Sequence, residues 1–257
     1  MDSRNLLIAE AVYYSGRWAD VVSAISSRAY LPDEEVVRIL RNIKCKVVTI
    51  LDKEYPQYLK KMYQPPLVLF YYGNLSLLND YNINIGIVGT RKPSEAGAKV
   101  THDITSKIAK RYIVVSGLAA GIDRIAHRTS INFGGKTIAV LGCGIEKCYP
   151  TSNQDLYDEI KKNPNCLLIS EYPGFTPPHK DNFPFRNRLI AQFSKAILVT
   201  ESKRKSGTAI TVGYGLFYGK DIMCVPSSNY NDSGCNLFLK EGAILVENSE
   251  HVIEIME

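Results

Sequence analysis

Seven short, largely apolar segments separated by helical patterns occupy residues 83–257 and restrict the fold more than any other feature. They lie at 85–88, 113–115, 137–141, 167–170, 196–200, 222–225 and 244–246. Continuous apolar strands of this length are typical of a sheet that is covered on both faces. In the clearest helical segment, 94–111, apolar residues recur four positions apart. Because crossovers between parallel strands are right-handed, the alternation predicts a doubly wound, mostly parallel α/β sheet with helices on both faces.

Different patterns precede this alternation. Residues 3 to about 43 carry apolar side chains at helical spacings, with Pro32 near the start of a third helix. Segments 46–51 and 67–72 are rich in β-forming residues and predict extra strands that flank the larger sheet. We therefore predict a small N-terminal helical region at 1–44 and an α/β domain at 45–257.

Composition excludes several classes of protein. No apolar run approaches the roughly 18 residues of a membrane span, and the N-terminus lacks a signal-peptide pattern, so a cytoplasmic protein without a membrane partner is expected. The net charge of +5 is only mildly basic, so the clustering of cations is more informative than their sum. Among six cysteines, Cys143 and Cys148 lack the second Cys/His pair of a zinc site. Reduced core thiols and no metal are predicted.

The segments that directly follow the predicted strands are rich in glycine, small hydroxyl residues and cations. Examples are Gly89-Thr90-Arg91, Ser116-Gly117, Gly142-Cys143-Gly144 and the run 201–208. The carboxyl ends of parallel strands meet at one rim of the sheet, where ligands of this fold class bind. Single turns of this kind are often Gly-rich for geometric reasons alone, but their repetition on one cationic rim favours an anion site.

The stretch 180–211 carries most of the predicted chemistry. Seven of its residues can face an anion or a base: Lys180, Phe183, Arg186, Arg188, Lys203, Arg204 and Lys205. Ser206-Gly207-Thr208 then opens a helix, whose free backbone N–H groups and dipole favour a negatively charged ligand. Cations, an aromatic ring and a helix N-terminus together indicate a phosphate-bearing partner, with a nucleic acid strand as one candidate.

Nucleotide-cofactor motifs do not match the chain. A dinucleotide site requires G-x-G-x-x-G after the first strand and an acid at the end of the second, but Gly86-Ile-Val-Gly89 and Ser116-Gly117 stand there. Gly135-Lys136-Thr137 imitates the end of a P-loop, yet it precedes a strand instead of following one. No cofactor is therefore predicted.

A catalytic set is also missing from the pattern. His127 is interpreted as a helix-packing or rim hydrogen-bonding residue, and Asp123 as a residue that caps or charges a helix start. Glu171 and Glu201 both end strands and could form a carboxylate pair, but the simpler interpretation is that they hold neighbouring arginines by ion pairs. The chain is predicted not to be an enzyme.

Five motifs follow one another along residues 45–257. They are G-T-R-K-P-S (89–94), S-G-L-A-A-G-I-D (116–123), F-P-F-R-N-R-L-I-A (183–191), S-G-T-A-I-T (206–211) and S-G-C-N-L-F-L-K-E-G-A (233–243). Together they resemble the DNA-processing protein A family (DprA, also called Smf). The resemblance implies an extended Rossmann-like fold, binding of single-stranded DNA, dimerisation, and delivery of the strand to the RecA recombinase during natural transformation.

Carried over by motif, the resemblance implies a DNA pocket formed by Arg91, Lys180 and Phe183. Arg186, Asn187 and Arg188 are expected to support it, with one arginine reaching DNA and the other pairing with Glu171 or Glu201. The remaining predicted DNA contacts are Gly89, Thr90, Ser116, Gly117, Ser206, Gly207 and Thr208. In this interpretation cations take phosphates and the Phe183 ring stacks on a base; the alternative is that Phe183 staples the helix start. By the same resemblance, homodimerisation is expected through about 221–257.

Two other function classes stay open at this stage. The Ser206-Gly207-Thr208 turn is similar to the G-G-x-G-T-x-x-E motif of nucleoside-monophosphate phosphoribohydrolases (the LOG family). That motif has a carboxylate three residues after its threonine, whereas this chain has Thr211. The other alternative is a nucleotide-sensing or interaction module without a role in DNA binding.

Overall fold

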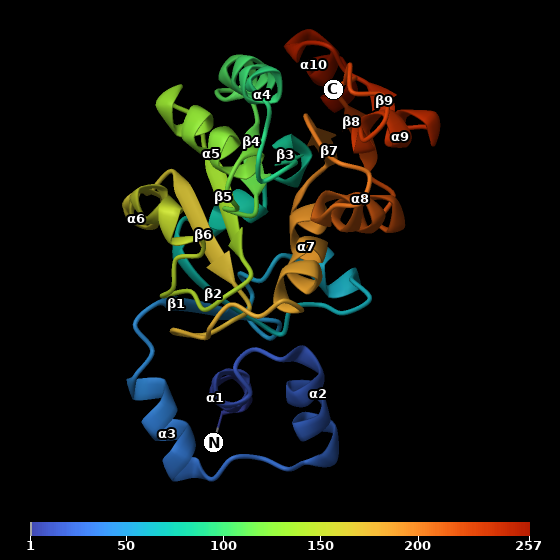
Figure 1. The fold of residues 1–257 in the computed structure, drawn as a ribbon. Helices are drawn as coiled ribbons and strands as arrows, with labels where there is room; N and C mark the ends of the chain where they lie inside the picture. Colours follow the sequence, from blue (N-terminus) through green and yellow to red (C-terminus); the bar gives the residue numbers. More distant parts are fainter. Residues whose placement is uncertain (1) are drawn as a thin grey trace.

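The protein, described here as a computed structural model over residues 2–257, contains one nine-stranded sheet (Figure 1). Its strand order is β1-β2-β6-β5-β4-β3-β7-β8-β9. The strands are β1 (Lys46–Thr49), β2 (Val68–Gly73), β3 (Asn84–Val88), β4 (Ile113–Ser116), β5 (Thr137–Leu141), β6 (Cys166–Ser170), β7 (Ala196–Val199), β8 (Asp221–Cys224) and β9 (Ile244–Leu245). All pairings along the order from β6 to β9 are parallel, whereas β1 pairs antiparallel with β2 and β2 pairs antiparallel with β6. The predicted doubly wound, mostly parallel sheet is confirmed, with the two extra strands at one edge.

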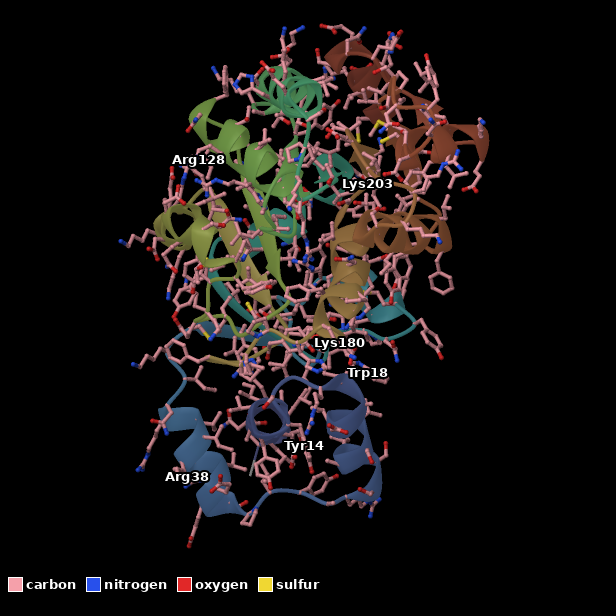
Figure 2. The ribbon with its side chains drawn as sticks, viewed as in Figure 1. Tyr14, Trp18, Arg38, Arg128, Lys180 and Lys203 are labelled. Carbon is pink, nitrogen blue, oxygen red and sulfur yellow. The ribbon has the colours of Figure 1, made fainter. Side chains whose placement is uncertain are left out.

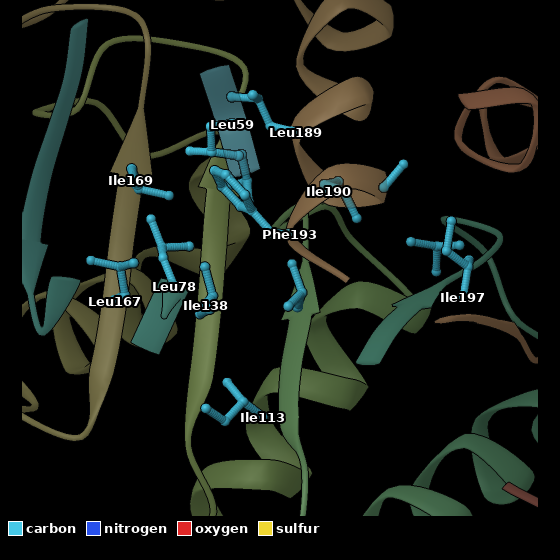
Figure 3. Packing of buried hydrophobic residues seen from close by; sticks show 14 of the residues in the cluster. Leu59, Leu78, Ile113, Ile138, Leu167, Ile169, Leu189, Ile190, Phe193 and Ile197 are labelled. Atoms are coloured by element: carbon cyan, nitrogen blue, oxygen red, sulfur yellow. The ribbon is translucent and has the colours of Figure 1, made fainter. Parts of the chain in front are cut away.

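Helices cover both faces of this sheet, as predicted. They are α4 (Glu95–Ile108), α5 (Ile122–Asn132), α6 (Gln154–Lys162), α7 (Asn182–Phe193), α8 (Gly207–Phe217), α9 (Gly234–Lys240) and α10 (Ser249–Met256), with 3-10 turns at Gln57–Lys61, Leu75–Leu78, Tyr81–Ile83 and Thr151–Asn153. Alternate side chains of β5 explain the two layers. Ile138 packs with Leu189 and Phe193 of α7 on one face (Figure 3), while Ala139 packs with the apolar residues of α6 on the other. The period of two therefore builds a core on each side.

The strand order reverses direction at β3. The chain runs outward from β3 through β4, β5 and β6, then crosses to β7 on the other side of β3. The turns that follow β3 and β7 consequently diverge, which opens a crevice between them at the carboxyl ends of the strands. This topological switch point is where the strand-end turns singled out in the sequence gather.

Three helices, α1 (Ser3–Tyr13), α2 (Trp18–Ser27) and α3 (Asp33–Arg41), lie beside the edge strands β1 and β2 (Figure 1). Trp18 Nε1 donates a hydrogen bond to the Pro65 carbonyl at 2.8 Å. Gly16, at φ +76°, packs so closely on the Glu171 carbonyl that a Cβ would overlap with it. Leu7 of α1 also shares a core cluster with Phe70 of β2. A division into 1–44 and 45–257 stays a prediction, since the two parts share packed residues.

The six cysteines are unpaired in residues 2–257, and five of them are buried, as predicted for core thiols. Burial raises the pKa of the Cys143 thiol to about 11, so this group is a poor nucleophile at neutral pH. No helix of residues 2–257 combines the length and the apolar character that a membrane crossing requires.

Candidate nucleic-acid interface

A groove of about 660 Å³ opens at the switch point; we call it the rim groove. It lies between the turn after β3, the segment that leads into α7, and the loop from β7 to α8. Ten of the predicted site residues line it: Gly89, Thr90, Arg91, Lys180, Phe183, Arg186, Asn187, Ser206, Gly207 and Thr208. Lys180 and Lys203, both labelled in Figure 2, contribute cations from two different loops. Residues more than 100 positions apart in the chain therefore share one cavity.

Arg91, Phe183 and Tyr149 form a row along the rim groove. The guanidinium carbon of Arg91 lies 5.8 Å from the centre of the Phe183 ring, within range of a cation–π contact. The Phe183 and Tyr149 ring centres are 5.4 Å apart with 37° between the planes. A Cβ on Gly142 would come within 2.7 Å of Phe183 Cδ1, so glycine is needed for the ring to lie here. One cation and two aromatic faces are thus presented together.

Phe183 does not have the position of a hydrophobic staple. A staple uses the residue before the N-cap, whereas Phe183 is the second residue of α7 and follows the N-cap Asp181. Its ring is half-buried and faces the groove and the loop after β5. The staple interpretation is therefore wrong.

Arg186 is buried, and its guanidinium group is held by the turn after β4. Nη1 donates to the carbonyl oxygens of Gly117, at 2.7 Å, and Val140, and Nε donates to Asn187 Oδ1 at 3.2 Å. Burial lowers the pKa of Arg186, and the nearby Asp123 carboxylate opposes this shift. An arginine nevertheless stays charged, so a fixed positive charge lies at the floor of the groove.

Asp123 fixes the shape of the same turn. In the first turn of α5, its Oδ2 accepts hydrogen bonds from the backbone N–H groups of Gly117, at 3.0 Å, and Ala119, at 3.3 Å. The prediction that Asp123 belongs to a helix start is confirmed. Burial raises the pKa of the Asp123 carboxyl, while the charge of Arg186 lowers it. The pair thus places opposite charges on either side of the turn at 117–119.

Arg188 lies outside the rim groove, so its predicted contact with DNA is corrected. Its side chain is 1% exposed, and Nη2 donates to both Glu171 oxygens at 2.6 Å. The guanidinium carbon also lies 4.0 Å from the centre of the Phe185 ring. The expectation that one of the two arginines pairs with a strand-end carboxylate is confirmed for Arg188. A direct contact between Arg188 and DNA is inconsistent with this burial.

Ser116 and Gly117 also lie beneath the rim groove and do not line it. Ser116 Oγ donates to the Ile87 carbonyl at 2.6 Å and is fully buried. Gly117 offers its carbonyl to Arg186, and a Cβ at this position would come within 2.7 Å of that guanidinium group. Their predicted DNA contacts are corrected to indirect support, because both residues are used by the protein itself.

Glu201 differs from the prediction that it holds an arginine. Its Oε2 instead accepts hydrogen bonds from the N–H and the Oγ of Ser94, both at 2.9 Å, at the N-terminus of α4. The Glu201 carbonyl accepts the N–H of Thr90 at 2.8 Å. Glu201 therefore connects the turn that carries Arg91 to the loop after β7. The N-terminus of a helix attracts a carboxylate and so competes with arginine for Glu201. The sequence pattern did not reveal that the start of α4 lies near Glu201.

Tyr149 was missed by sequence reasoning. It lies in the loop after β5 and is 41% exposed on the wall of the rim groove. The only sequence feature that could have indicated Tyr149 is that an aromatic residue stands beside Pro150 in a loop that follows a strand. His127, by contrast, was predicted to pack or to form a hydrogen bond at the rim: it is buried, with Nδ1 2.6 Å from Thr137 Oγ1.

The fold and the groove together define a doubly wound α/β protein with a cationic, aromatic-lined site at the switch point. The sequence profile of the family described as DNA recombination-mediator protein A matches residues 46–257, and the chain belongs to this family. DNA processing protein DprA of Bacillus subtilis (strain 168) is 37% identical over 222 residues, which cover 85% of this chain and 74% of the relative.

Two solved structures of family members match this chain over most of its length. DNA processing protein A from Streptococcus pneumoniae superimposes with a TM-score of 0.83 at 33% identity, covering 98% of this chain and 93% of that one. The protein from Helicobacter pylori, whose structure concerns its single-stranded DNA binding mode, gives a TM-score of 0.74 at 27% identity, covering 83% of this chain and 95% of that one. The likeness to the S. pneumoniae protein thus extends over the helical region as well as the sheet.

Proposed function

We propose that the rim groove binds single-stranded DNA with little preference for sequence. The observation that carries this proposal is the row of Arg91, Phe183 and Tyr149 within one cationic cavity. Base–aromatic stacking is worth about 1–3 kcal/mol per base and tolerates any base, because every base has a π face. Only an unpaired strand can present those faces, so a duplex binds less well.

The phosphates have a separate set of partners. Lys180 and Lys205 are exposed cations on the lining of the rim groove, and Arg91 adds a planar donor suited to two phosphate oxygens. The first turn of α8 has no side-chain cap, and the Cβ space at Gly207 is open. The Ala209 N–H donates to the Ser206 carbonyl at 3.2 Å, which leaves the N–H groups of Gly207 and Thr208 available to a phosphate. Cations and backbone donors bind the backbone while the two rings bind bases.

The biological role follows from family membership and the groove together. We infer a cytoplasmic recombination mediator that protects incoming single strands and helps to load RecA during natural transformation. Homodimerisation through about 221–257 is supported by the apolar edge strand β9, in which Ile244 and Leu245 are exposed. Such an edge is a ready site for pairing with another chain. The protein acts by binding and presenting a strand, not by catalysis.

An anisotropy titration tests the proposed ligand. Labelled oligothymidine is compared with a duplex of equal length at several salt concentrations. We expect tighter binding of the single strand and a linear fall of log K with log salt, from counterion release. Binding that favours the duplex, or that ignores salt, would contradict the proposal.

A phosphoribohydrolase activity is the alternative with a specific assay. Thr211 lies on the groove lining at the position where that family's motif has a carboxylate. Incubation with nucleoside monophosphates is expected to release no free base. A nucleotide-sensing module would bind mononucleotides as tightly as oligothymidine, which a competition titration measures.

A further inference from the structure

A second hollow, of about 510 Å³, lies on the opposite side of the loop at 202–206 from the rim groove. We call it the far hollow. Its lining includes two cations and one aromatic residue: Arg204, Lys240 and Tyr230. Tyr230 is 78% exposed, so its ring is accessible to a ligand in the hollow.

The backbone explains why one loop serves both cavities. Lys203 forms an antiparallel bridge with Ser233, Arg204 N donates to the Asp232 carbonyl at 3.2 Å, and Gly234 N donates to the Ser202 carbonyl at 2.7 Å. The bridge holds Lys203, and the chain bends at 204–206. Lys203 and Lys205 line the rim groove, while Arg204 lines the far hollow.

The cations of the far hollow are available to a ligand. Arg204 and Lys240 are exposed and form no ion pair within residues 2–257. Asp232, the acid in the backbone contact with this loop, lies 3.9 Å from Lys203 Nζ. Its carboxylate therefore faces Lys203, which lines the rim groove. The floor is formed by Asn236, whose side chain is already bonded to the backbone of Ser227. The hollow is therefore built from a fixed frame with two unpartnered positive charges.

We propose that the far hollow is a second subsite for the same polynucleotide, which crosses the loop at 203–205 after leaving the rim groove. This inference rests on the proposed single-strand binding and extends its site. Arg204 and Lys240 bind phosphates beyond the loop, and Tyr230 stacks on a base there. Continuous cations on both sides of one loop provide the electrostatic path that a flexible strand follows.

Oligothymidines of two lengths test the subsite, one of about 5 and one of about 20 nucleotides, so that only the longer spans both cavities. The double variant Arg204→Ala/Lys240→Ala is expected to bind the short strand like the wild type. For the long strand we expect about tenfold weaker binding and a salt slope reduced by about 1.4, two contacts at about 0.7 each. Tyr230→Ala should weaken only the long strand. The matched control is Lys110→Ala, which removes an exposed cation after α4, at the opposite rim of the sheet. This control should bind both strands like the wild type.

The outcomes separate this inference from the proposed function. If the wild type binds neither length, both fail. If the wild type binds both but the double variant weakens neither, or weakens both equally, the far hollow is not a subsite while the rim groove stands. Light scattering of each variant completes the test: an unchanged molar mass is expected, whereas a changed mass would assign the hollow to assembly and overturn the inference.

Discussion

The Phe183 ring lies 5.4 Å from the Tyr149 ring, and the two rings come from α7 and from the loop after β5. Removing either ring from a stacking site is expected to cost about 1–3 kcal/mol of binding free energy. We expect Phe183→Ala and Tyr149→Ala each to weaken oligothymidine binding in anisotropy titrations. The double variant should lose less than the sum, because adjacent rings share one stacked strand. The control is Phe133→Ala, which removes an exposed ring at the C-terminal end of α5 and should leave affinity unchanged. Full affinity in both Phe183→Ala and Tyr149→Ala would contradict the assignment.

Gly142 provides an independent test of the same ring position. A Cβ there would lie 2.7 Å from Phe183 Cδ1, so Gly142→Ala must displace the ring. Affinity for oligothymidine is expected to fall to about that of Phe183→Ala, with unfolding by urea little changed. The matched control is Gly213→Ala, in α8, where the added carbon meets nothing within 4 Å apart from its chain neighbours and the backbone of its own helix. This change should leave affinity intact and stabilise the helix by about 0.5–1 kcal/mol. Wild-type affinity in Gly142→Ala would show that the ring position is unimportant.

The buried Arg188–Glu171 ion pair affects the free energy of unfolding. Arg188→Met leaves the Glu171 carboxylate without its partner, and such a change costs about 3–5 kcal/mol. In residues 2–257, Arg188 Nε and Nη1 also lack hydrogen-bond partners, so the native pair is itself incompletely satisfied. The double variant Arg188→Met/Glu171→Leu should therefore recover most of the lost stability in urea denaturation. Arg17→Ala, from an exposed pair, should change it by less than about 1 kcal/mol. A double variant as unstable as Arg188→Met would refute this account.

His127 predicts how stability depends on pH. Burial lowers the pKa of His127 from 6.5 to about 3, so the folded protein holds the imidazole neutral where the unfolded chain protonates it. The unfolded state then binds more protons between these values, and stability falls as pH decreases through this window. From about pH 7 to about pH 5 the loss is on the order of 2 kcal/mol. Urea unfolding at several pH values measures it, and His127→Gln should flatten the curve. An equally steep acid loss in the variant would assign it to other groups.

The sequence predicted the rim groove because topology alone brings strand ends together. Arg91 follows β3 and Ser206 follows β7 by several residues, so a parallel sheet places both at one edge once the strand order reverses. The direction of side chains within α7 could not be predicted. Arg186 and Arg188 are two residues apart and both buried, yet they contact different partners because tertiary packing, not spacing, selects those partners.

Loops were the least predictable part. Tyr149 reaches the groove along a loop whose path no periodicity determines. Glu201 looked like an arginine partner, but it bonds the Ser94 backbone at the start of α4, a competitor that only the folded chain brings near. Both misses concern contacts between segments far apart in the sequence.

Arg91→Ala tests the central claim most directly. Arg91 is the cation of the aromatic row, and loss of a charge-assisted phosphate contact costs about 1.5–3 kcal/mol. Oligothymidine affinity, measured by anisotropy in a salt series, should fall by about 10- to 100-fold, and the slope of log K against log salt should decrease by about 0.7. Urea unfolding should remain that of the wild type. Undiminished affinity with an unchanged salt slope in a folded Arg91→Ala protein would contradict the assignment of the rim groove to a nucleic acid strand.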